Sequence, residues 1–536
     1  MNRIQMCQQM DANREPWDLG IIGGGATGLG IAVDAASRGL RVILFEQRDF
    51  AKGTSSRSTK LIHGGVRYLQ QGNIRLVMEA LRERGILRRN APHLVKNQSF
   101  IIPQYKWWEG PFYGIGLKVY DWMSGSLGLG PSRYLSLEET LELAPTLDPE
   151  GLRGGVLYHD GQFDDARLAI NLAQTAADLG AVLLSYFPVT GLKKSGGRIT
   201  AIQVSDFLSE KVGEVPVKVL VNATGVFADE IMEMDEGKHE SIVAPSQGVH
   251  IVLEKSFLPG RAAILVPHTD DGRVLFAVPW HDRIIVGTTD TLVDKPTLEP
   301  VALSEEIDFI LQQIGHYLAK EPQKKDIRSV FAGLRPLVKN SSRKTAELSR
   351  DHLVQISSSG LITVTGGKWT TYRRMAQDVV DMALREGRLG ERPCVTQQLP
   401  IHGAKEDTDF DSPLYYYGQD RDRVLALQKE NPSLGDRIHP DLPYIGAEIL
   451  WATRNDMCMT VEDALSRRTR SLLLDARAAS EAAPLVAHIM AVELRKTDAW
   501  EETQVREFRL LANNYLPEGL GTGNGTAGTM IQNKSI

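Results

Sequence analysis

Three glycines near the start of the chain, Gly23, Gly25 and Gly28, have the spacing G-x-G-x-x-G. Glycines at these positions allow a tight turn, a close approach of the backbone to a pyrophosphate, and close packing of the helix that follows. The N-terminus of that helix also favours negative charge, because its first N–H groups have no partner within the helix. The spacing therefore predicts a site for the diphosphate of a dinucleotide.

An acidic residue downstream supports this prediction. Glu46 ends the apolar run VILFE, roughly twenty residues after the glycines, where a carboxylate can accept hydrogen bonds from ribose hydroxyls. A carboxylate at this position disfavours the 2′-phosphate of NADP. NAD and FAD use the same phosphate geometry, so these residues leave both open. The alternative is an ordinary glycine-rich turn with Glu46 as a solvated strand end.

The elements around these residues form a predicted βαβ unit. From Trp17, WDLGII has the pattern of a short apolar strand, the glycine turn opens a helix of small residues, and VILFE is a second strand. Further along, DDARLAINLAQTAADLGAVLLSY has helical periodicity that leads to a strand, and KVLVNATG is an apolar strand that ends in a glycine turn. We expect both segments to extend the same parallel sheet.

Other segments indicate two more units. GVHIVLE, AAILVPH, RVLFAVPW and RIIVGTTD alternate as an antiparallel sheet would, and the pattern beyond Pro393 is helical and rich in charge. The predicted fold class is α/β: a Rossmann-like, doubly wound domain, an antiparallel-sheet substrate domain and a C-terminal helical domain. The expected ranges are 16–100, 155–235 and 325–385 for the first, 101–154 and 236–324 for the second, 395–515 for the third, and 1–15 and 519–536 for flexible termini.

The composition excludes several classes of protein. The chain has 536 residues, of which 42% are hydrophobic and 24% charged, as expected of a globular protein with more than one packed unit. Its 61 Lys and Arg against 67 Asp and Glu leave a net charge of −6, which argues against nucleic acid as a partner.

The cysteines and the apolar runs bear on location. Cys7, Cys394 and Cys458 lie far apart, so we expect neither a disulfide framework nor a metal site, and we expect an intracellular protein. There is no apolar run of about 18 residues, and the polar start lacks the apolar region of a secretory signal. Any membrane contact is therefore expected to be peripheral.

An ordered series of motifs follows the glycine turn. TSSRSTKLIHGGVRYL covers Thr54 to Leu69, and QFDDARL, VNATG, GVHIV, VGTTD, AGLRPL, LSRDH and GGKWTTYR follow in that order. In this series the chain resembles the FAD-dependent, quinone-linked glycerol-3-phosphate dehydrogenases over roughly its first seven-tenths, and SRRTRSLLLD is similar to their C-terminal domain.

The resemblance implies a cofactor, a reaction and a location. The cofactor would be FAD, bound by the Rossmann-like domain, and the reaction would oxidise sn-glycerol 3-phosphate at C2 to dihydroxyacetone phosphate, with electrons passing to a quinone. It also implies a cytoplasmic enzyme held peripherally on the inner face of the cytoplasmic membrane. Oligomeric state stays open, and a homodimer is compatible with these features.

Three other functions remain as alternatives. The first is an oxidase that passes the electrons to oxygen and makes hydrogen peroxide. The second is an amine or amino-acid oxidase of the same wider fold, which the number of cations in the motifs disfavours. The third is a flavoprotein-like binding module without turnover.

The matched motifs supply candidates for the substrate site. A phosphate dianion needs fixed cations, and the motifs contain Arg67, Arg335, Arg350 and Lys368. Arg335 could also stabilise the alkoxide that develops at C2. Two hydroxyl groups, those of Tyr68 and Thr289, could bind substrate or have a structural role.

Oxidation at C2 also needs a base for the hydroxyl proton, and histidine suits neutral pH. Two histidines lie in matched motifs, His63 in LIHGG and His250 in GVHIV. We favour His63, because its segment directly follows the dinucleotide unit, where the family's flavin contacts cluster. The resemblance further implies cofactor contacts from Gly23, Gly25, Ala26, Thr27, Gly28, Glu46, Thr54, Ser55, Lys60, Leu61, Val189, Gly225, Gly367, Lys368 and Thr370.

An aromatic segment at 105–125, YKWWEGPFYGIGLKVYDWMSG, permits two interpretations. Its aromatic residues and lysines are typical of an anchor at a membrane interface. The same aromatics could instead fill the core of the substrate domain, since Glu109 and Asp121 interrupt the apolar face.

Overall fold

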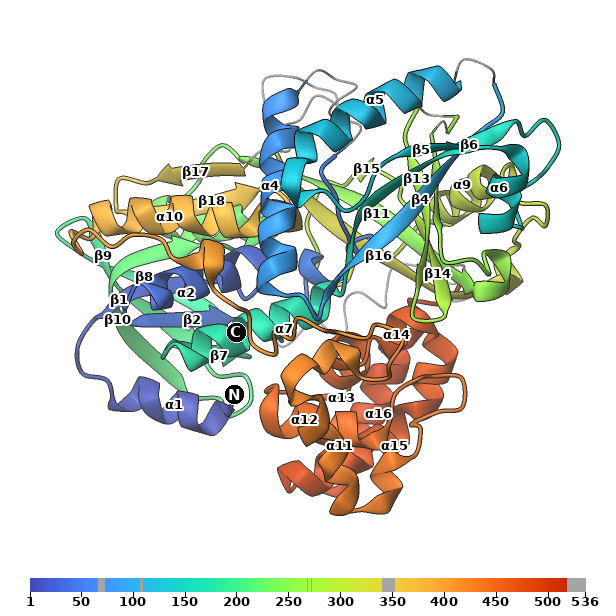
Figure 1. Cartoon of the computed structure of the whole chain (residues 1–536). Helices are drawn as coiled ribbons and strands as arrows, with labels where there is room; N and C mark the ends of the chain where they lie inside the picture. Colours follow the sequence, from blue (N-terminus) through green and yellow to red (C-terminus); the bar gives the residue numbers. More distant parts are fainter. Residues whose placement is uncertain (66–72, 107–108, 268, 271, 340–351, 518–536) are drawn as a thin grey trace.

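The computed structural model describes residues 1–65, 73–106, 109–267, 269–270, 272–339 and 352–517. Two sheets with their covering helices lie side by side, and a helical region packs below both in the view of Figure 1. Within these ranges, no helix is long and apolar enough to cross a membrane.

The first sheet is built on the predicted βαβ unit. Strand β1 (Trp17–Ile22) runs parallel to β2 (Val42–Glu46) on one side and to β10 (Val212–Asn222) on the other. The strand order is β17-β18-β10-β1-β2-β7, with β9 pairing to β10 and β8 to β9. The other strands are β7 (Val182–Ser185), β8 (Val189–Ser195), β9 (Arg198–Ser205), β17 (His352–Ile356) and β18 (Leu361–Gly366).

Helices cover this sheet and bury its central strands. Helix α2 (Ala26–Ser37) packs against both α7 (Asp165–Asp178) and α10 (Tyr372–Glu386), and α8 (Ala228–Glu236) contacts β8 and β18. β1 and β2 read as near-continuous apolar runs because both faces of a covered parallel sheet are buried. The prediction of a doubly wound α/β domain is confirmed.

The second sheet is largely antiparallel, as the alternating segments predicted. Its order is β15-β11-β14-β13-β12-β4-β6-β3, with β16 pairing to β11 and β5 to β6. The strands are β3 (Leu61–Ile62), β4 (Val95–Gln104), β5 (Arg133–Leu135), β6 (Gly154–Phe163), β11 (Val243–Glu254), β12 (Ala263–Val266), β13 (Leu275–Trp280), β14 (Arg283–Gly287), β15 (Thr291–Leu292) and β16 (Ile327–Val338). Its helices are α4 (Ile74–Asn90), α5 (Glu109–Ser124), α6 (Leu137–Leu143) and α9 (Ser304–Gly315).

Sheet membership differs from the ranges expected from the sequence. β3, most of β4, β6 and β16 fall inside 16–100, 155–235 and 325–385, yet all four strands pair in the second sheet. Hydrogen-bonded neighbours decide to which sheet a strand belongs, and the alternation within one strand does not record them. The chain thus passes between the two sheets more often than the sequence pattern indicates.

The C-terminal region is helical, as predicted. It contains α11 (Arg421–Ala426), α12 (Gly446–Asn455), α13 (Val461–Asp463), α14 (Ser471–Leu474), α15 (Ala476–Leu494) and α16 (Asp498–Asn513). The other terminus differs from expectation, because residues 3–12 form helix α1 (Arg3–Ala12) instead of a flexible tail. Met6 is buried, and Arg3 pairs with Asp206 at 2.6 Å, so the helix is held to the first sheet. The predicted flexible end 519–536 lies outside the described residues.

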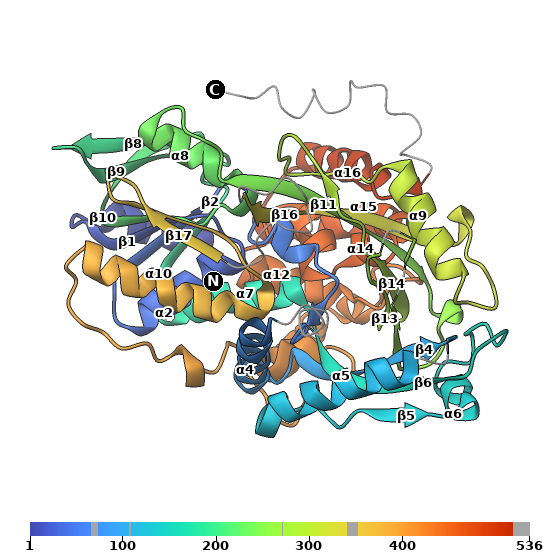
Figure 2. The same ribbon diagram turned by 90° about the horizontal axis from the view of Figure 1, so that it is seen from above.

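The aromatic segment divides between the two interpretations. Helix α5 lies beside α4 and β6 in both views (Figures 1 and 2), and it buries Tyr113 and Tyr120 while Trp122 is 83% exposed. Trp107 and Trp108 lie outside the described residues. The inner face of this helix therefore belongs to the core, and its outer face presents an aromatic side chain to solvent.

Candidate functional site

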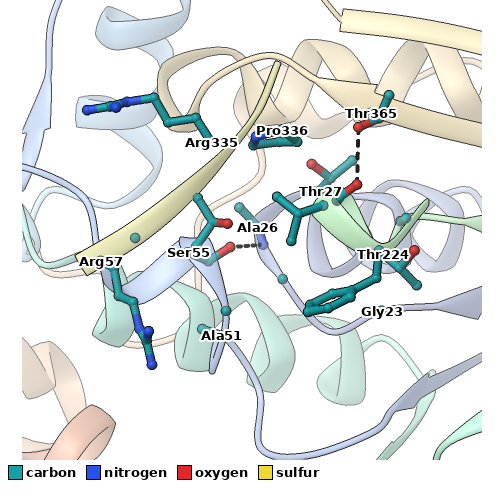
Figure 3. Close-up of a pocket in the computed structure, with 18 of the residues that line it drawn as sticks. Gly23, Ala26, Thr27, Ala51, Ser55, Arg57, Thr224, Arg335, Pro336 and Thr365 are labelled. Atoms are coloured by element: carbon teal, nitrogen blue, oxygen red, sulfur yellow. Dashed lines mark hydrogen bonds between the residues drawn. The ribbon is translucent and has the colours of Figure 1, made fainter. Parts of the chain in front are cut away.

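A cavity of about 420 Å³ lies between the two sheets (Figure 3). On one side it is lined by segments at the carboxyl ends of β1, β2, β10 and β18 and by the turn that precedes β3. On the other side β11 and β16 contribute residues such as His250 and Arg335. The carboxyl ends of parallel strands are the usual place for ligands in open α/β sheets.

The glycine turn between β1 and α2 forms the floor of the cavity. Gly23 has φ of +107°, and a Cβ on it would lie 2.6 Å from the carbonyl oxygen of Ala223. A Cβ on Gly28 would lie 1.9 Å from the carbonyl oxygen of Gly23, so only glycine lets α2 approach the strand this closely. Gly25 is the N-cap of α2 and offers no side-chain cap, which leaves the helix N-terminus for an anion.

Glu46 stands at the end of β2, where the motif places it. Its carboxylate accepts hydrogen bonds from the backbone N–H of Gly24 at 2.7 Å and of Arg48 at 2.9 Å. Burial raises the pKa of Glu46 despite these hydrogen bonds. The carboxylate is thus fixed beside the glycine turn and borders the cavity.

The turn before β3 is joined to three other parts of the site. Ser55 Oγ accepts a hydrogen bond from the N–H of Ala26 at 2.9 Å, as Figure 3 shows, and the Ser55 carbonyl accepts one from the indole of Trp369 at 2.8 Å. Thr54 Oγ donates to the carbonyl of Leu334, next to Arg335, at 2.5 Å. One short segment therefore connects the dinucleotide turn, β16 and the residues that follow β18.

The end of β18 forms a second glycine turn at the cavity. Gly366 and Gly367 both have positive φ, of 82° and 77°, and Lys368 then precedes a short 3-10 helix at Trp369–Thr371. Thr365 donates a hydrogen bond to the Gly225 carbonyl at 3.2 Å, which ties this turn to the end of β10 (Figure 3). The arrangement brings Lys368 and a helix N-terminus to the same cavity.

Arg335 enters the cavity from β16. Its guanidinium donates to the carbonyl of Thr289 at 3.1 Å, to the hydroxyl of Thr288 at 3.0 Å and to the carboxylate of Asp290 at 3.3 Å. The side chain is 28% exposed, so the oriented cation can also reach a ligand. In Figure 3 it points away from Arg57, whose guanidinium pairs with Glu299 at 2.7 Å.

The two candidate histidines both line the cavity but differ in environment. His63 follows β3 and is half-buried, whereas His250 is 2% exposed within β11. The His250 ring stacks on Phe331, with centroids 4.8 Å apart, and its Nε2 lies 2.9 Å from Thr59 Oγ. Burial, reinforced by the nearby cations Arg335 and Lys60, lowers the pKa of His250 well below its usual value. This ring is neutral at physiological pH.

Comparison with known proteins places the chain among flavoenzymes. A family model described as FAD dependent oxidoreductase matches residues 18–373, and one described as the C-terminal domain of alpha-glycerophosphate oxidase matches residues 394–504. The human mitochondrial glycerol-3-phosphate dehydrogenase is 39% identical over 93% of this chain and 73% of its own length. The corresponding protein of Arabidopsis thaliana is 39% identical over 94% of this chain and 86% of its own. The chain belongs to the FAD-dependent glycerol-3-phosphate dehydrogenase family.

Solved structures agree with this assignment. The glycerol-3-phosphate dehydrogenase of Bacillus halodurans, solved in complex with FAD, superposes with a TM-score of 0.78 at 29% identity, covering 96% of this chain and 97% of that one. The L-alpha-glycerophosphate oxidase of Mycoplasma pneumoniae shares the fold, with a TM-score of 0.56 at 18% identity over 72% of this chain and 99% of that one.

The cavity of this family member fits its cofactor, FAD. The N-terminus of α2, where Ser55 binds only the N–H of Ala26, and the glycines that leave no room for a Cβ form a cradle for the diphosphate. Glu46 borders the same cavity at the distance along the chain that ribose recognition requires. The second glycine turn, at Gly366 and Gly367, lines the same cavity.

Most residues expected at the site from the sequence line this cavity. They are Gly23, Gly25, Ala26, Thr27, Glu46, Thr54, Ser55, Leu61, His63, Val189, Gly225, His250, Arg335, Gly367, Lys368 and Thr370. Arg67, Tyr68 and Arg350 lie outside the described residues.

Three expected residues do not reach the cavity wall. Gly28 packs behind the turn, and Lys60 is fully buried with its ammonium 2.7 Å from Asp165. The hydroxyl of Thr289 donates to Glu306 at 2.9 Å and accepts from the N–H of Val249, so it supports β11 from behind. These three residues pack or hydrogen-bond behind the residues that line the cavity.

Some residues at the cavity were not expected from the sequence. Thr59 and Arg57 lie in the motif TSSRSTKL and Trp369 in GGKWTTYR, so the matched motifs contained the signal for them. Phe187 and Glu230 also line the cavity, but they lie in no motif. Only the folding of distant segments brings these two to the site.

The C-terminal helical region is joined to the cofactor side by buried charges. Asp49, which follows β2, pairs with Arg468 at 2.7 Å and also with Arg467. Burial raises the pKa of Asp49, but the two guanidinium groups outweigh it and hold the pKa below its usual value. Lys52, at the cavity, pairs with Glu462. The motif SRRTR thus anchors the segment that follows Glu46.

Proposed function

We propose that this chain oxidises sn-glycerol 3-phosphate at C2 to dihydroxyacetone phosphate and passes the electrons to a quinone. The observation that carries the proposal is one cavity that combines the dinucleotide turn with Arg335, Lys368 and two histidines. FAD, when bound, supplies the acceptor for the two electrons that leave C2 with its hydrogen. The residues of the chain must bind the phosphate, orient C2 and remove the hydroxyl proton.

The cations of the cavity suit a phosphorylated alcohol. Lys368 follows the second glycine turn, where a compact positive charge can meet a phosphate. Arg335 is oriented by three acceptors and can donate to an oxygen that becomes negative as the C2 proton leaves. Relatives of 39% identity named glycerol-3-phosphate dehydrogenase support this substrate.

His63 is the better candidate for the base. A base must accept a proton and carry the charge, but burial and the neighbouring Arg335 disfavour a charged ring at His250. His63 is half-buried at the same cavity and can carry that charge at lower cost. His250 then serves as a neutral hydrogen-bonding group.

An anaerobic visible spectrum tests the reaction. Glycerol 3-phosphate should bleach the flavin bands of the purified protein, and a quinone analogue should restore them. The variant His63→Ala should slow bleaching by about 100-fold or more, as expected for a lost general base, while the dissociation constant for substrate changes little. The matched control His250→Ala should lose less. The opposite order would assign the base to His250, and bound flavin that does not bleach would refute the substrate.

Peroxide formation separates the dehydrogenase from the oxidase. The second family match carries the description of an oxidase domain, so oxygen is the alternative acceptor. Turnover in air should produce little hydrogen peroxide, and the quinone analogue should raise the rate of substrate oxidation. A stoichiometric yield of peroxide that the quinone does not change would favour the oxidase.

A quinone acceptor places the enzyme at a membrane surface, peripherally on its cytoplasmic face. The outer surface of α5 supports this location, because Trp122 and Val119 are 83% and 41% exposed beside Lys118. Tyr134 of β5, which is 53% exposed, adds to the same surface. Aromatic and basic side chains together suit the interface between lipid headgroups and water.

A further inference from the structure

The turn that carries Thr59 is held by a buried charge pair. The ammonium of Lys60 lies 2.8 and 2.7 Å from the two carboxylate oxygens of Asp165, and neither side chain is exposed. Asp165 also accepts hydrogen bonds from the N–H of Ser58 at 3.1 Å and from its hydroxyl at 2.7 Å. The residues on both sides of Thr59 are therefore fixed to the first turn of α7, and Thr59 has little freedom to move.

The Thr59 hydroxyl, in the turn before β3, meets His250 of β11. The two lie 2.9 Å apart at Nε2, and the rest of the ring is confined by its stack on Phe331. A Cβ on Gly287 would lie 2.3 Å from Cδ2 of His250, so the neighbouring strand closes the remaining side. The other ring nitrogen, Nδ1, is buried and finds no hydrogen-bond partner among the described residues. The ring is thus fixed on three sides, and His250 as a residue lines the cavity.

A neutral imidazole has one nitrogen that donates and one that accepts, and the hydrogen bond at one nitrogen decides the role of the other. His250 is neutral here, with the cations Arg335 and Lys60 facing it and opposing a positive charge. The hydroxyl at Nε2 therefore holds this nitrogen in place, whichever of the two groups donates. We propose that Thr59 is a positioning residue for the reaction, because its hydroxyl fixes the orientation of the His250 ring through Nε2.

This inference rests on the proposed oxidation of glycerol 3-phosphate, in which His250 is a neutral hydrogen-bonding group at the substrate. Thr59 itself then needs no contact with the reacting atoms. Its effect reaches the substrate only through His250, so replacing Thr59 should matter only while His250 is present.

A double-mutant cycle of Thr59 and His250 tests this dependence. Thr59→Val keeps the shape of the side chain and removes the hydroxyl, whereas Thr59→Ser keeps the hydroxyl. We expect Thr59→Val to slow anaerobic flavin reduction at saturating substrate about tenfold, the usual effect of one hydrogen bond, and Thr59→Ser to restore it. In the background of His250→Ala the effect of Thr59→Val should fall below about twofold, since coupled residues are not additive. FAD affinity and the midpoint of thermal unfolding should stay at the wild-type values.

The outcomes separate this inference from the proposed function. If the wild-type flavin does not bleach with glycerol 3-phosphate, the proposed reaction is refuted and the role of Thr59 with it. If the wild type bleaches and Thr59→Val bleaches equally fast, only the positioning role is refuted. A tenfold loss that persists in the background of His250→Ala, or that Thr59→Ser does not restore, also refutes it.

Discussion

Replacing Gly28 by alanine should abolish tight binding of FAD without any direct contact to the cofactor. Gly28 packs behind the dinucleotide turn and does not line the cavity. The new Cβ would lie 1.9 Å from the carbonyl oxygen of Gly23, about 1.5 Å closer than the 3.4 Å at which ordinary contact begins. The clash is with backbone, so no flexible side chain can move aside to relieve it. The N-terminus of α2 must move away from the end of β1.

The size of the effect follows from the hydrogen bonds that this movement breaks. Backbone N–H groups at the helix N-terminus bind a diphosphate only at hydrogen-bond distance, and a shift of more than 1 Å exceeds the tolerance of such bonds. Each hydrogen bond to a charged group contributes about 1.5–3 kcal/mol. Losing two of them weakens binding by about 3–6 kcal/mol, which is about 100-fold to 10⁴-fold in the dissociation constant.

The assay is a titration of the apoprotein with FAD, followed by the change in flavin fluorescence. Gly116→Ala is the matched control, because Gly116 lies in α5, does not line the cavity, and has no atom within 4 Å of its Cβ position. The control should bind FAD as the wild type does. A Gly28→Ala protein with wild-type affinity for FAD would refute the argument that close packing of α2 creates the diphosphate site.

Three further predictions follow from the geometry. Arg335→Ala should retain FAD but slow flavin reduction about 100-fold to 1,000-fold, and a near-normal steady-state rate from the flavin-loaded variant would contradict its role at the substrate. Asp49→Asn leaves the guanidinium of Arg468 buried without its carboxylate, while Arg467 keeps Glu462 and Asp463, and it should lower the free energy of unfolding by about 3–5 kcal/mol. The pKa of Asp49 is lowered in the folded protein, so the carboxylate stabilises the fold at every pH above its ordinary pKa. Urea unfolding should therefore show the same decrease in free energy of unfolding for Asp49→Asn at pH 8 and at pH 5. A smaller decrease at pH 5 would contradict the assignment. Val119→Ser should weaken binding to lipid vesicles relative to the wild type, whereas Val212→Ser, at another exposed position, should not. Equal effects of the two substitutions would contradict a contact between α5 and the membrane.

The local motifs identified most of the described site because each contains its own geometry. The glycine spacing, Glu46 and the segment from Thr54 to Leu61 need only a strand, a turn and a helix in order, and the structure forms these elements as expected. Lys60 shows the limit of such reasoning. Its motif lies at the cavity, as expected, but the ammonium of Lys60 forms a buried ion pair with Asp165, which is more than 100 residues away in the sequence. A motif therefore predicted the neighbourhood of this residue and not the direction of its charge.

The fold shows the same division. Apolar patterns predicted the parallel strands β1, β2 and β10 and the antiparallel strands β11 to β14. A strand buried on both faces is a continuous apolar run, and a strand buried on one face alternates apolar and polar residues. Helix α1 was missed, since its polar surface hides a single buried residue, Met6. The assignment of β3, β4, β6 and β16 to the second sheet was missed for a different reason, because strand pairing is a relation between distant segments.

The sequence by itself determined the family, the cofactor class and the strand ends that line the cavity, because short motifs create turns and helix termini from local backbone geometry. Only the tertiary structure decided which of these residues face one another. It placed Thr59 against His250, which lies 191 residues further along the chain, and it buried Lys60 against Asp165. It also buried the His250 ring while His63 kept part of its exposure. Burial and the charge of neighbours set the protonation of a side chain, and both arise only when distant segments pack together.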